Sequence, residues 1–526
     1  KTQGDWFYCK GINQFWLHGI TLSPYEQSPG LGLGTYGSRF GRNNTWWKYA
    51  QPWFEYQSRC QYMLQQGQST ADILYYVGED APVDPELKEN LIPGIPEGYD
   101  YDFCNHDMLK KLKVEDGKLI LPNRLEYAVL VVKNSEHITL DALKILQDHI
   151  QNGAVVVAFK PLRTPGINVE ESVQKELKDL TDEIWGECDG GSVKTNNYGN
   201  GILYCGDAVL TAFRDIELLP DFEFSTLKSE GTGEALFSGS GFEYIHRETS
   251  KTDVYFVSNQ HNYAKVANIK FRISDKLPEL WDPETGEIRT APEYKKLDDG
   301  RIQVTLRMED AGSVFVVFRK NLTEESASDY KSPEVIRQLS FNSPWQVSFD
   351  GAGAPEKIEL SEPIDLSKHN NPEVAHFSGT ISYQNQIEIG ELDDQSNAIL
   401  DLGQVEVAAE VFVNDQSAGI LWKRPFRIDI TEYLIEGANT IQVDVANLWV
   451  NRLIGDQKLP EHAEWTTNTG SNAAGMGREK VADWVIRGEE SPTGRKAFVS
   501  WKWNHLKKKE LVPSGLIGPV NVIIEK

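Results

Sequence analysis

The chain has 526 residues and a mass of 59.4 kDa, which is too long for one hydrophobic core and predicts about three or four domains. Its 78 acidic and 53 basic residues give a net charge of -25, which disfavours binding to nucleic acid or to an anionic membrane surface. An apolar content of 40% excludes wholesale disorder, and no apolar run reaches the about 18 residues of a membrane span.

Residues 1–67 predict the C-terminal part of a (β/α) barrel. Residues 11–18 have the pattern of a short buried strand, a loop rich in Gly and Pro follows, and a helix is predicted over 45–66. The chemistry of such barrels lies at the C-terminal ends of the strands, which is where His18 stands. His18 is therefore either a structural histidine or a hydrogen-bonding partner of the substrate.

The rest of the chain predicts three further domains. Buried strands that alternate with a helix at 140–151 indicate a doubly wound, flavodoxin-like α/β domain over 68–215. Short strands separated by turns predict a β-sandwich over 216–330, with a polar linker at 321–332. The strands of 331–526 predict a jelly roll, so the chain as a whole is a multidomain α/β plus all-β protein.

Two motifs near the N-terminus have competing interpretations. The run Gly32–Gly37 fits GxGxxG, but it neither follows a strand nor opens a helix, so we favour an active-site loop over a nucleotide site. Trp46 and Trp47 start the predicted helix and point about 100° apart. One indole can pack in the core or at a domain boundary, and the other can stack under a sugar ring.

Acidic residues are sparse in the barrel-like segment. Glycoside hydrolysis needs two carboxylates that face one bond. Among Asp5, Glu26, Glu55 and Asp72, Glu26 alone lies in a predicted strand-end loop. The sequence therefore predicts that the catalytic acids are mostly or wholly absent from this chain.

No metal site is predicted from the residue pattern. Asp100, Asp102 and Asp107 lack the glycine-containing loop that is usual for calcium, and we expect them in the acidic first turn of a helix. The five cysteines are widely spaced and odd in number, which favours buried free thiols and leaves one disulfide open.

Several runs together resemble glycoside hydrolase family 106, the calcium-dependent α-L-rhamnosidases. The runs that carry this resemblance are 11–13 with His18, 40–47, 59–67, 76–82, 98–103, 245–247, 255–259 and 280–283. Runs 377–380 and 447–456 are similar to the sugar-binding jelly roll of glycoside hydrolase family 2, a galactose-binding-like fold. Two positions depart from the family pattern, since Gly19 stands where Arg is common and Gly41 where an acidic residue is usual.

The resemblance implies an enzyme that removes terminal α-L-rhamnosyl groups from plant polysaccharide with inversion, using two carboxylates and calcium. It also implies that most of the barrel and its catalytic glutamates lie upstream of Lys1 and that the protein is secreted or periplasmic. We expect His18, Tyr25, Trp46 and Trp47 to contact the sugar, and we assign no catalytic residue and no calcium ligand within this chain.

Two other functions stay open. The chain could be a carbohydrate-binding scaffold without chemistry, with Trp422, Trp449 or Trp465 as the stacking platform of the last domain. It could also be a relative of the β-galactosidases that shares the same accessory domains.

Overall fold

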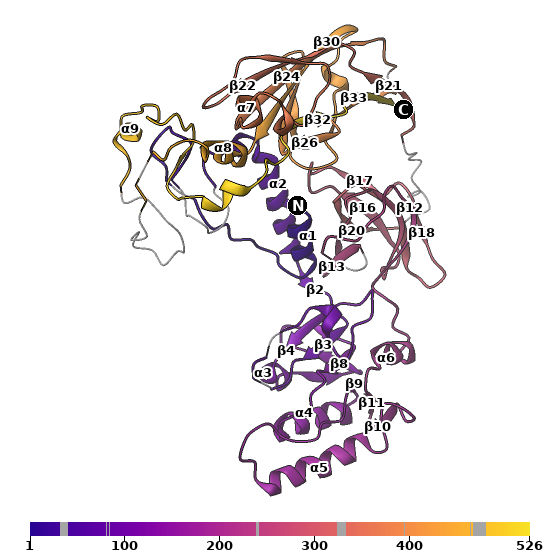
Figure 1. Cartoon of the computed structure of the whole chain (residues 1–526). Helices are drawn as coiled ribbons and strands as arrows, with labels where there is room; N and C mark the ends of the chain where they lie inside the picture. Colours follow the sequence, from indigo (N-terminus) through magenta and orange to yellow (C-terminus); the bar gives the residue numbers. More distant parts are fainter. Residues whose placement is uncertain are drawn as a thin grey trace. The chain divides into compact units, whose positions relative to one another are not determined.

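The computed structural model describes residues 1–526 except 21, 32–39, 80, 84, 238–240, 323–332, 394, 463 and 466–479. The chain divides into two compact units. Unit 1 comprises Lys1, Gln14–Arg59 and Lys331–Lys526, and unit 2 comprises Thr2–Asn13 and Cys60–Tyr330 (Figure 1). The motif at 32–37 and most of the predicted linker at 321–332 lie outside the described residues, and the bounds of the four predicted domains stay predictions.

The first layer of unit 2 is a mixed sheet that is parallel except at one edge. Its strands are β3 (Ile73–Tyr76), β4 (Tyr101–Cys104), β8 (Val129–Val132), β9 (Val155–Ala158), β10 (Thr195–Tyr198) and β11 (Gly201–Cys205). They lie in the order β10-β11-β9-β8-β3-β4, and only the β10–β11 pair is antiparallel. The parallel strands thus run 2-1-3-4-5 in chain order, the flavodoxin-like arrangement that the alternating pattern predicted.

Helices cover both faces of this sheet, because β3, β8 and β9 are buried on both sides and leave no polar face. Helices α4 (Leu140–Gln151) and α5 (Glu171–Trp185) pack on one face, and α6 (Val209–Asp215) packs on the other (Figure 1). Cys188 and Cys205 form a disulfide, so the expectation of free thiols is wrong for this pair. Cys9, Cys60 and Cys104 are buried thiols that form no disulfide, as expected.

The second layer of unit 2 is an antiparallel β-sandwich, as the short strands and turns predicted. One sheet has the order β12-β15-β19-β18 and the other β17-β16-β20-β14-β13-β2. Its strands are β2 (Gln68–Ser69), β12 (Phe222–Ser229), β13 (Phe242–Glu248), β14 (Asp253–Asn259), β15 (Lys265–Phe271), β16 (Lys276–Trp281), β17 (Ile288–Thr290), β18 (Tyr294–Lys296), β19 (Ile302–Met308) and β20 (Ser313–Asn321). Alternating residues of β15 and β19 point into its core.

The C-terminal part of unit 1 is a second antiparallel sandwich. Its sheets have the orders β21-β33-β25-β29 and β23-β22-β24-β30-β27-β28. The strands are β21 (Val335–Ser340), β22 (Trp345–Asp350), β23 (Ile358–Leu360), β24 (Gly379–Ile389), β25 (Asn397–Asp401), β27 (Ala408–Val413), β28 (Gln416–Leu421), β29 (Arg427–Asp429), β30 (Gly437–Asn447) and β33 (Asn521–Glu525). Strands β24 and β30 pair over eleven residues and organise a core that includes the buried Trp345.

The N-terminal residues differ from the barrel fragment that was predicted. Residues 2–9 form helix α1 (Thr2–Cys9), and residues 12–19 form neither a helix nor a strand. A strand needs a neighbouring strand for its backbone groups, and among the described residues this stretch pairs with no strand; an isolated bridge joins Ile20, at its end, to Phe40. The predicted helix at 45–66 starts later, as the 3-10 turn η1 (Trp47–Tyr49) followed by α2 (Gln51–Leu64).

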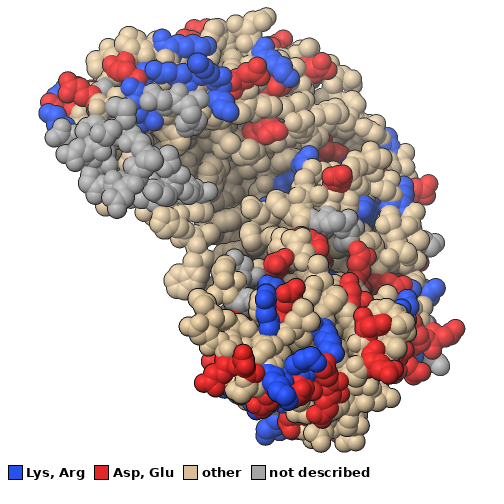
Figure 2. All heavy atoms as spheres, turned by 60° about the horizontal axis from the view of Figure 1, so that its bottom comes forward, with Lys and Arg blue, Asp and Glu red and all other residues tan. Residues whose placement is uncertain are grey.

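None of the described helices combines the length and the apolar character needed to cross a bilayer. The face of the molecule in Figure 2 carries acidic and basic side chains intermixed rather than gathered by sign.

Candidate functional site

One face of η1 and α2 forms the wall of an open pocket in unit 1. Its lining residues share helical spacing: Trp47, Ala50, Gln51, Phe54, Glu55, Ser58 and Arg59. We call this pocket, of about 570 Å³, the α2 groove. The opposite face of the same segment carries Tyr49, Tyr56 and Cys60, which are buried, so the groove residues are the side of the helix that the core leaves open.

Aromatic rings fix the shape of the groove wall. Trp47 meets Phe54 edge to face with ring centroids 6.0 Å apart, and Phe54 meets Trp53 at 4.9 Å. Phe40 stacks on Trp53 at 6.1 Å. Each ring is braced by another, so Trp47 and Phe54 present flat apolar surface in a defined orientation, as a platform for the apolar face of a sugar requires.

Polar side chains line the groove beside the rings. Gln51 donates to a Glu55 carboxylate oxygen at 2.9 Å, and Arg59 pairs with the other oxygen of Glu55 at 3.4 Å. These groups can donate to and accept from sugar hydroxyls. Glu55 is the single carboxylate among the lining residues, so the groove does not contain the two facing carboxylates that glycoside hydrolysis requires.

The structure separates the four residues that we predicted to contact a sugar. Trp47 lines the groove, and His18 and Tyr25 do not. His18 is exposed in an irregular segment, and Tyr25 lies in the loop of residues 22–28. Gln51, Phe54, Ser58 and Arg59 were missed, although counting in helical steps from Trp47 would have grouped them.

Trp46 packs in a hydrophobic cluster, which is the structural one of the two alternatives considered for these tryptophans. Its indole packs with the buried Tyr49, Ala408 and Ala446 of unit 1, and it meets Phe40 at 5.9 Å. The two neighbouring tryptophans therefore divide the roles that the sequence left open, with Trp46 in a hydrophobic cluster and Trp47 on the groove.

Glu26, the acid that we placed in a strand-end loop, takes part in a structural contact. Arg42 pairs with it at 3.2 Å and also donates to the Tyr25 carbonyl at 3.4 Å. Asn43 donates to the same carbonyl at 3.3 Å. Arg42 and Asn43 thus hold this loop, and neither caps the following helix.

The three tryptophans considered as a platform in the last domain are engaged within unit 1. Trp422 lies 5.5 Å from the Tyr56 ring. Trp449 donates to the Asn43 carbonyl at 3.0 Å, and Trp465 donates to Glu461 at 3.0 Å. All three indoles are partly exposed, and their role as a stacking platform stays a prediction.

Asp100, Asp102 and Asp107 do not share a helix turn, contrary to expectation. Asp102 lies on β4 and accepts from Tyr127 at 2.8 Å, and Asp107 lies on α3 (His106–Leu109). Asp100 precedes β4, and burial raises its pKa to about 7. Over the described residues, no three His, Cys, Asp or Glu side chains come together as metal ligands, so these residues do not fit a calcium site.

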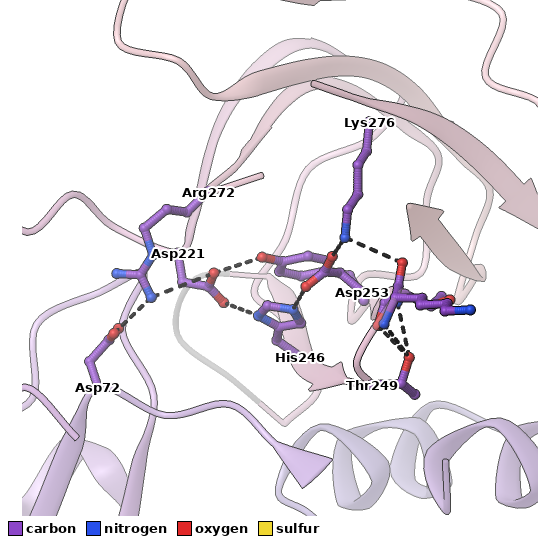
Figure 3. A network of polar contacts seen from close by, with 10 residues as sticks. Asp72, Asp221, His246, Thr249, Asp253, Arg272 and Lys276 are labelled. Atoms are coloured by element: carbon purple, nitrogen blue, oxygen red, sulfur yellow. Dashed lines mark hydrogen bonds and ion pairs between the residues drawn. The ribbon is translucent and has the colours of Figure 1, made fainter. Parts of the chain in front are cut away.

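A second polar cluster lies inside unit 2, between the parallel sheet and the sandwich (Figure 3). His246 on β13 contacts Asp221 at 3.1 Å and Asp253 at 3.3 Å, and it stacks on Tyr255. Arg272 joins Asp221 to Asp72, which precedes β3, and Lys276 pairs with Asp253 at 2.5 Å. We call these residues the His246 cluster.

The charges of the His246 cluster compensate one another. Burial alone would lower the pKa of His246, but the Asp221 and Asp253 carboxylates outweigh it and raise that pKa to about 9. Burial alone would raise the pKa of Asp221, but His246 and Arg272 outweigh it and lower that pKa. The centre of the cluster is buried, since the side chains of His246 and Asp221 are 5% and 3% exposed, whereas Arg272 and Lys276 at its edge are 23% and 31% exposed. The cluster joins the parallel sheet of unit 2 to its β-sandwich.

Comparison with known proteins gives two family matches. The alpha-L-rhamnosidase family of glycoside hydrolases 106 matches residues 1–296. The sugar-binding domain of glycosyl hydrolases family 2 matches residues 311–469. The second match covers most of the last sandwich and implies that this part of the protein binds carbohydrate.

Two similar proteins extend over the whole chain. A solved rhamnosidase from Novosphingobium sp. PP1Y is 29% identical with a TM-score of 0.78, over 99% of this chain and 45% of that one. A putative beta-glucuronidase of Formosa agariphila is 25% identical over all of this chain and 61% of its own length. The chain thus spans less than two thirds of either protein.

Proposed function

Because the chain belongs to the alpha-L-rhamnosidase family of glycoside hydrolases 106, we propose that it forms the substrate-binding part of an enzyme that hydrolyses terminal α-L-rhamnosyl linkages in plant polysaccharide. The observation that carries this proposal is the α2 groove. Braced aromatic rings stand there next to amide, hydroxyl and guanidinium donors on one helix face.

The groove orients the sugar and does not cleave the bond. Trp47 and Phe54 cover the apolar side of the ring, and Gln51, Ser58 and Arg59 donate to its hydroxyls. Holding the sugar in one orientation lowers the entropic cost of the reaction.

Cleavage with inversion uses one carboxylic acid to protonate the leaving oxygen and a second carboxylate to activate water on the opposite face. Glu55 is already paired with Arg59. We therefore assign both catalytic acids to polypeptide outside this chain. Calcium, which the family resemblance implies, is assigned there too, and no step of the proposal passes through it.

The exposed apolar side chains of Trp16, Ile20 and Leu22 support an additional covering segment. Trp16 is 87%, Ile20 78% and Leu22 84% exposed. Large apolar side chains gathered in this way mark a surface that another segment buries. We propose that a part of the barrel outside this chain packs here.

We also propose that the protein is secreted or periplasmic. The Cys188–Cys205 disulfide supports this location, because disulfides persist in oxidising compartments and are rare in the cytosol.

Equilibrium dialysis with labelled L-rhamnose tests the groove. Trp47→Ala is expected to weaken binding at the groove about tenfold, a loss of about 1.4 kcal/mol. Tyr62→Ala is the matched control, since Tyr62 is an aromatic residue of the same helix that is 68% exposed and does not line the groove. Equal affinity of the wild type and Trp47→Ala would overturn the proposal.

A further inference from the structure

The parallel sheet of unit 2 carries a second pocket, at the carboxyl ends of its strands. The sheet has the 2-1-3-4-5 order, so the chain leaves β3 towards β4 on one side and leaves β8 towards β9 on the other. The crevice between β3 and β8 is therefore the topological switch point. In open α/β sheets, this is the place where ligands bind. The structure has a pocket of about 190 Å³ there. We call it the switch-point pocket.

The floor of the switch-point pocket is apolar and held in place. Tyr75, on β3, is 1% exposed and donates to the Ile92 carbonyl at 2.8 Å. Phe103, on β4, meets the Tyr75 ring edge to face at 5.8 Å and is 37% exposed. The backbone amide of Asn134 donates to the same Ile92 carbonyl at 2.8 Å, which fixes the segment after β8 to the loop after β3. The floor therefore presents an aromatic surface that the fold holds in place without a ligand.

The rim of the pocket is polar, with side chains available for a ligand. It is formed by Glu86, Asn90, Lys133 and Asn134. Their backbones make turn and loop hydrogen bonds, but their side chains make no hydrogen bond or ion pair with the residues that the structure describes. Two amides, one carboxylate and one ammonium together offer several donors and acceptors around an apolar floor.

The chemistry of the rim selects among ligand classes. A phosphate group would call for backbone amides at a helix N-terminus or for several cations. Among the described lining residues Lys133 is the one cation, and Glu86 opposes it. A neutral ring with hydroxyl groups and an apolar face matches both the rim and the floor.

We propose that the switch-point pocket is a second carbohydrate site, which binds a single neutral monosaccharide unit with its apolar face on Phe103. The choice of a sugar over other small polar molecules rests on the proposed function. The pocket itself shares no lining residue with the α2 groove. Two binding sites on one chain would raise the avidity for a polymer with many sugar branches.

Stoichiometry tests this proposal on the whole chain. Equilibrium dialysis with labelled L-rhamnose is expected to saturate at about one equivalent less for Phe103→Ala than for the wild type. Phe7→Ala is the matched control, because Phe7 is also 37% exposed and lines neither pocket. Asn134→Ala removes a rim amide while leaving the backbone bond to Ile92, so it keeps the fold and should weaken the second site several-fold.

The results separate this site from the groove. Loss of one equivalent in Phe103→Ala, together with about tenfold weaker binding at the groove in Trp47→Ala, supports both sites. Unchanged stoichiometry in Phe103→Ala, together with unchanged affinity in Asn134→Ala, overturns the switch-point site and leaves the groove standing. Unchanged binding in Trp47→Ala, with loss in Phe103→Ala, overturns the groove alone. No binding by the wild type overturns both.

Discussion

The His246 cluster and the α2 groove place similar chemical groups in opposite surroundings. Both combine acidic, basic and aromatic side chains. In the cluster, each charge faces a compensating partner inside the protein, whereas the groove leaves its rings and donors open. A histidine between two carboxylates resembles catalytic machinery in its charges, but substrate cannot reach it. Access, rather than a shifted pKa, distinguishes the binding site that we propose for this chain from the buried structural cluster.

This comparison predicts that damage to the cluster costs stability. Asp221→Ala removes the partner of His246, Tyr255 and Arg272 at once, and it should lower the free energy of unfolding by about 3–5 kcal/mol. Urea unfolding measures this loss. Glu55→Ala in the groove breaks an exposed ion pair and should cost about 0.3–0.5 kcal/mol. Similar losses of unfolding free energy for Asp221→Ala and Glu55→Ala would contradict the distinction between the cluster and the groove.

The Cys188–Cys205 disulfide is also expected to stabilise unit 2. Cys188 and Cys205 are 17 residues apart, so replacing both by Ala should lower the free energy of unfolding by about 3 kcal/mol. Dithiothreitol should lower the thermal midpoint of the wild type and leave that of the double variant unchanged. A wild type that is insensitive to the reductant would show that the bond does not stabilise the unit.

The stability of unit 2 should depend on pH through His246. The folded pKa of about 9 lies above the unfolded value of about 6.5, so protonated His246 stabilises the fold. This contribution is complete below about pH 6.5 and is lost as the pH rises towards about 9. Urea midpoints across this range should fall more steeply for the wild type than for His246→Gln. Identical slopes would mean that His246 is not charged in the folded protein.

The smallest change in stability is expected for a substitution in the α2 groove, where L-rhamnose affinity is the more sensitive measurement. Glu55→Gln keeps the size of the side chain and removes its pairing with Arg59, so the urea midpoint should stay nearly constant. L-rhamnose affinity at the groove should change several-fold, because Arg59 is then oriented differently. Lowered stability of Glu55→Gln with unaltered L-rhamnose affinity would show that Glu55 has a structural role and does not affect binding.

Much of the fold could be predicted from the sequence, because apolar runs and helical spacing are patterns within single segments. Apolar runs identified β3, β8 and β9, and the helical spacing of 140–151 matched α4 to the residue. The predicted strand at 11–18 was wrong because a strand also depends on a neighbour, which periodicity within one segment does not reveal.

The site was harder to predict than the fold. The sugar contacts predicted for Trp46 and Trp47 stay predictions, and the sequence did not distinguish the two residues. That difference depends on the contacts of Trp46 with Ala408 and Ala446, far away in the sequence. The His246 cluster likewise joins residues from 72 to 276, and no spacing along the chain brings them together.

The account depends most on the claim that this chain orients the sugar while the catalytic acids lie in other polypeptide. Release of nitrophenol from p-nitrophenyl α-L-rhamnoside tests that claim directly, measured for this chain and for a longer protein that includes the preceding coding sequence. We expect turnover by the longer protein and none by these 526 residues. Hydrolysis by this chain alone, at a rate that matches the longer protein, would contradict the account.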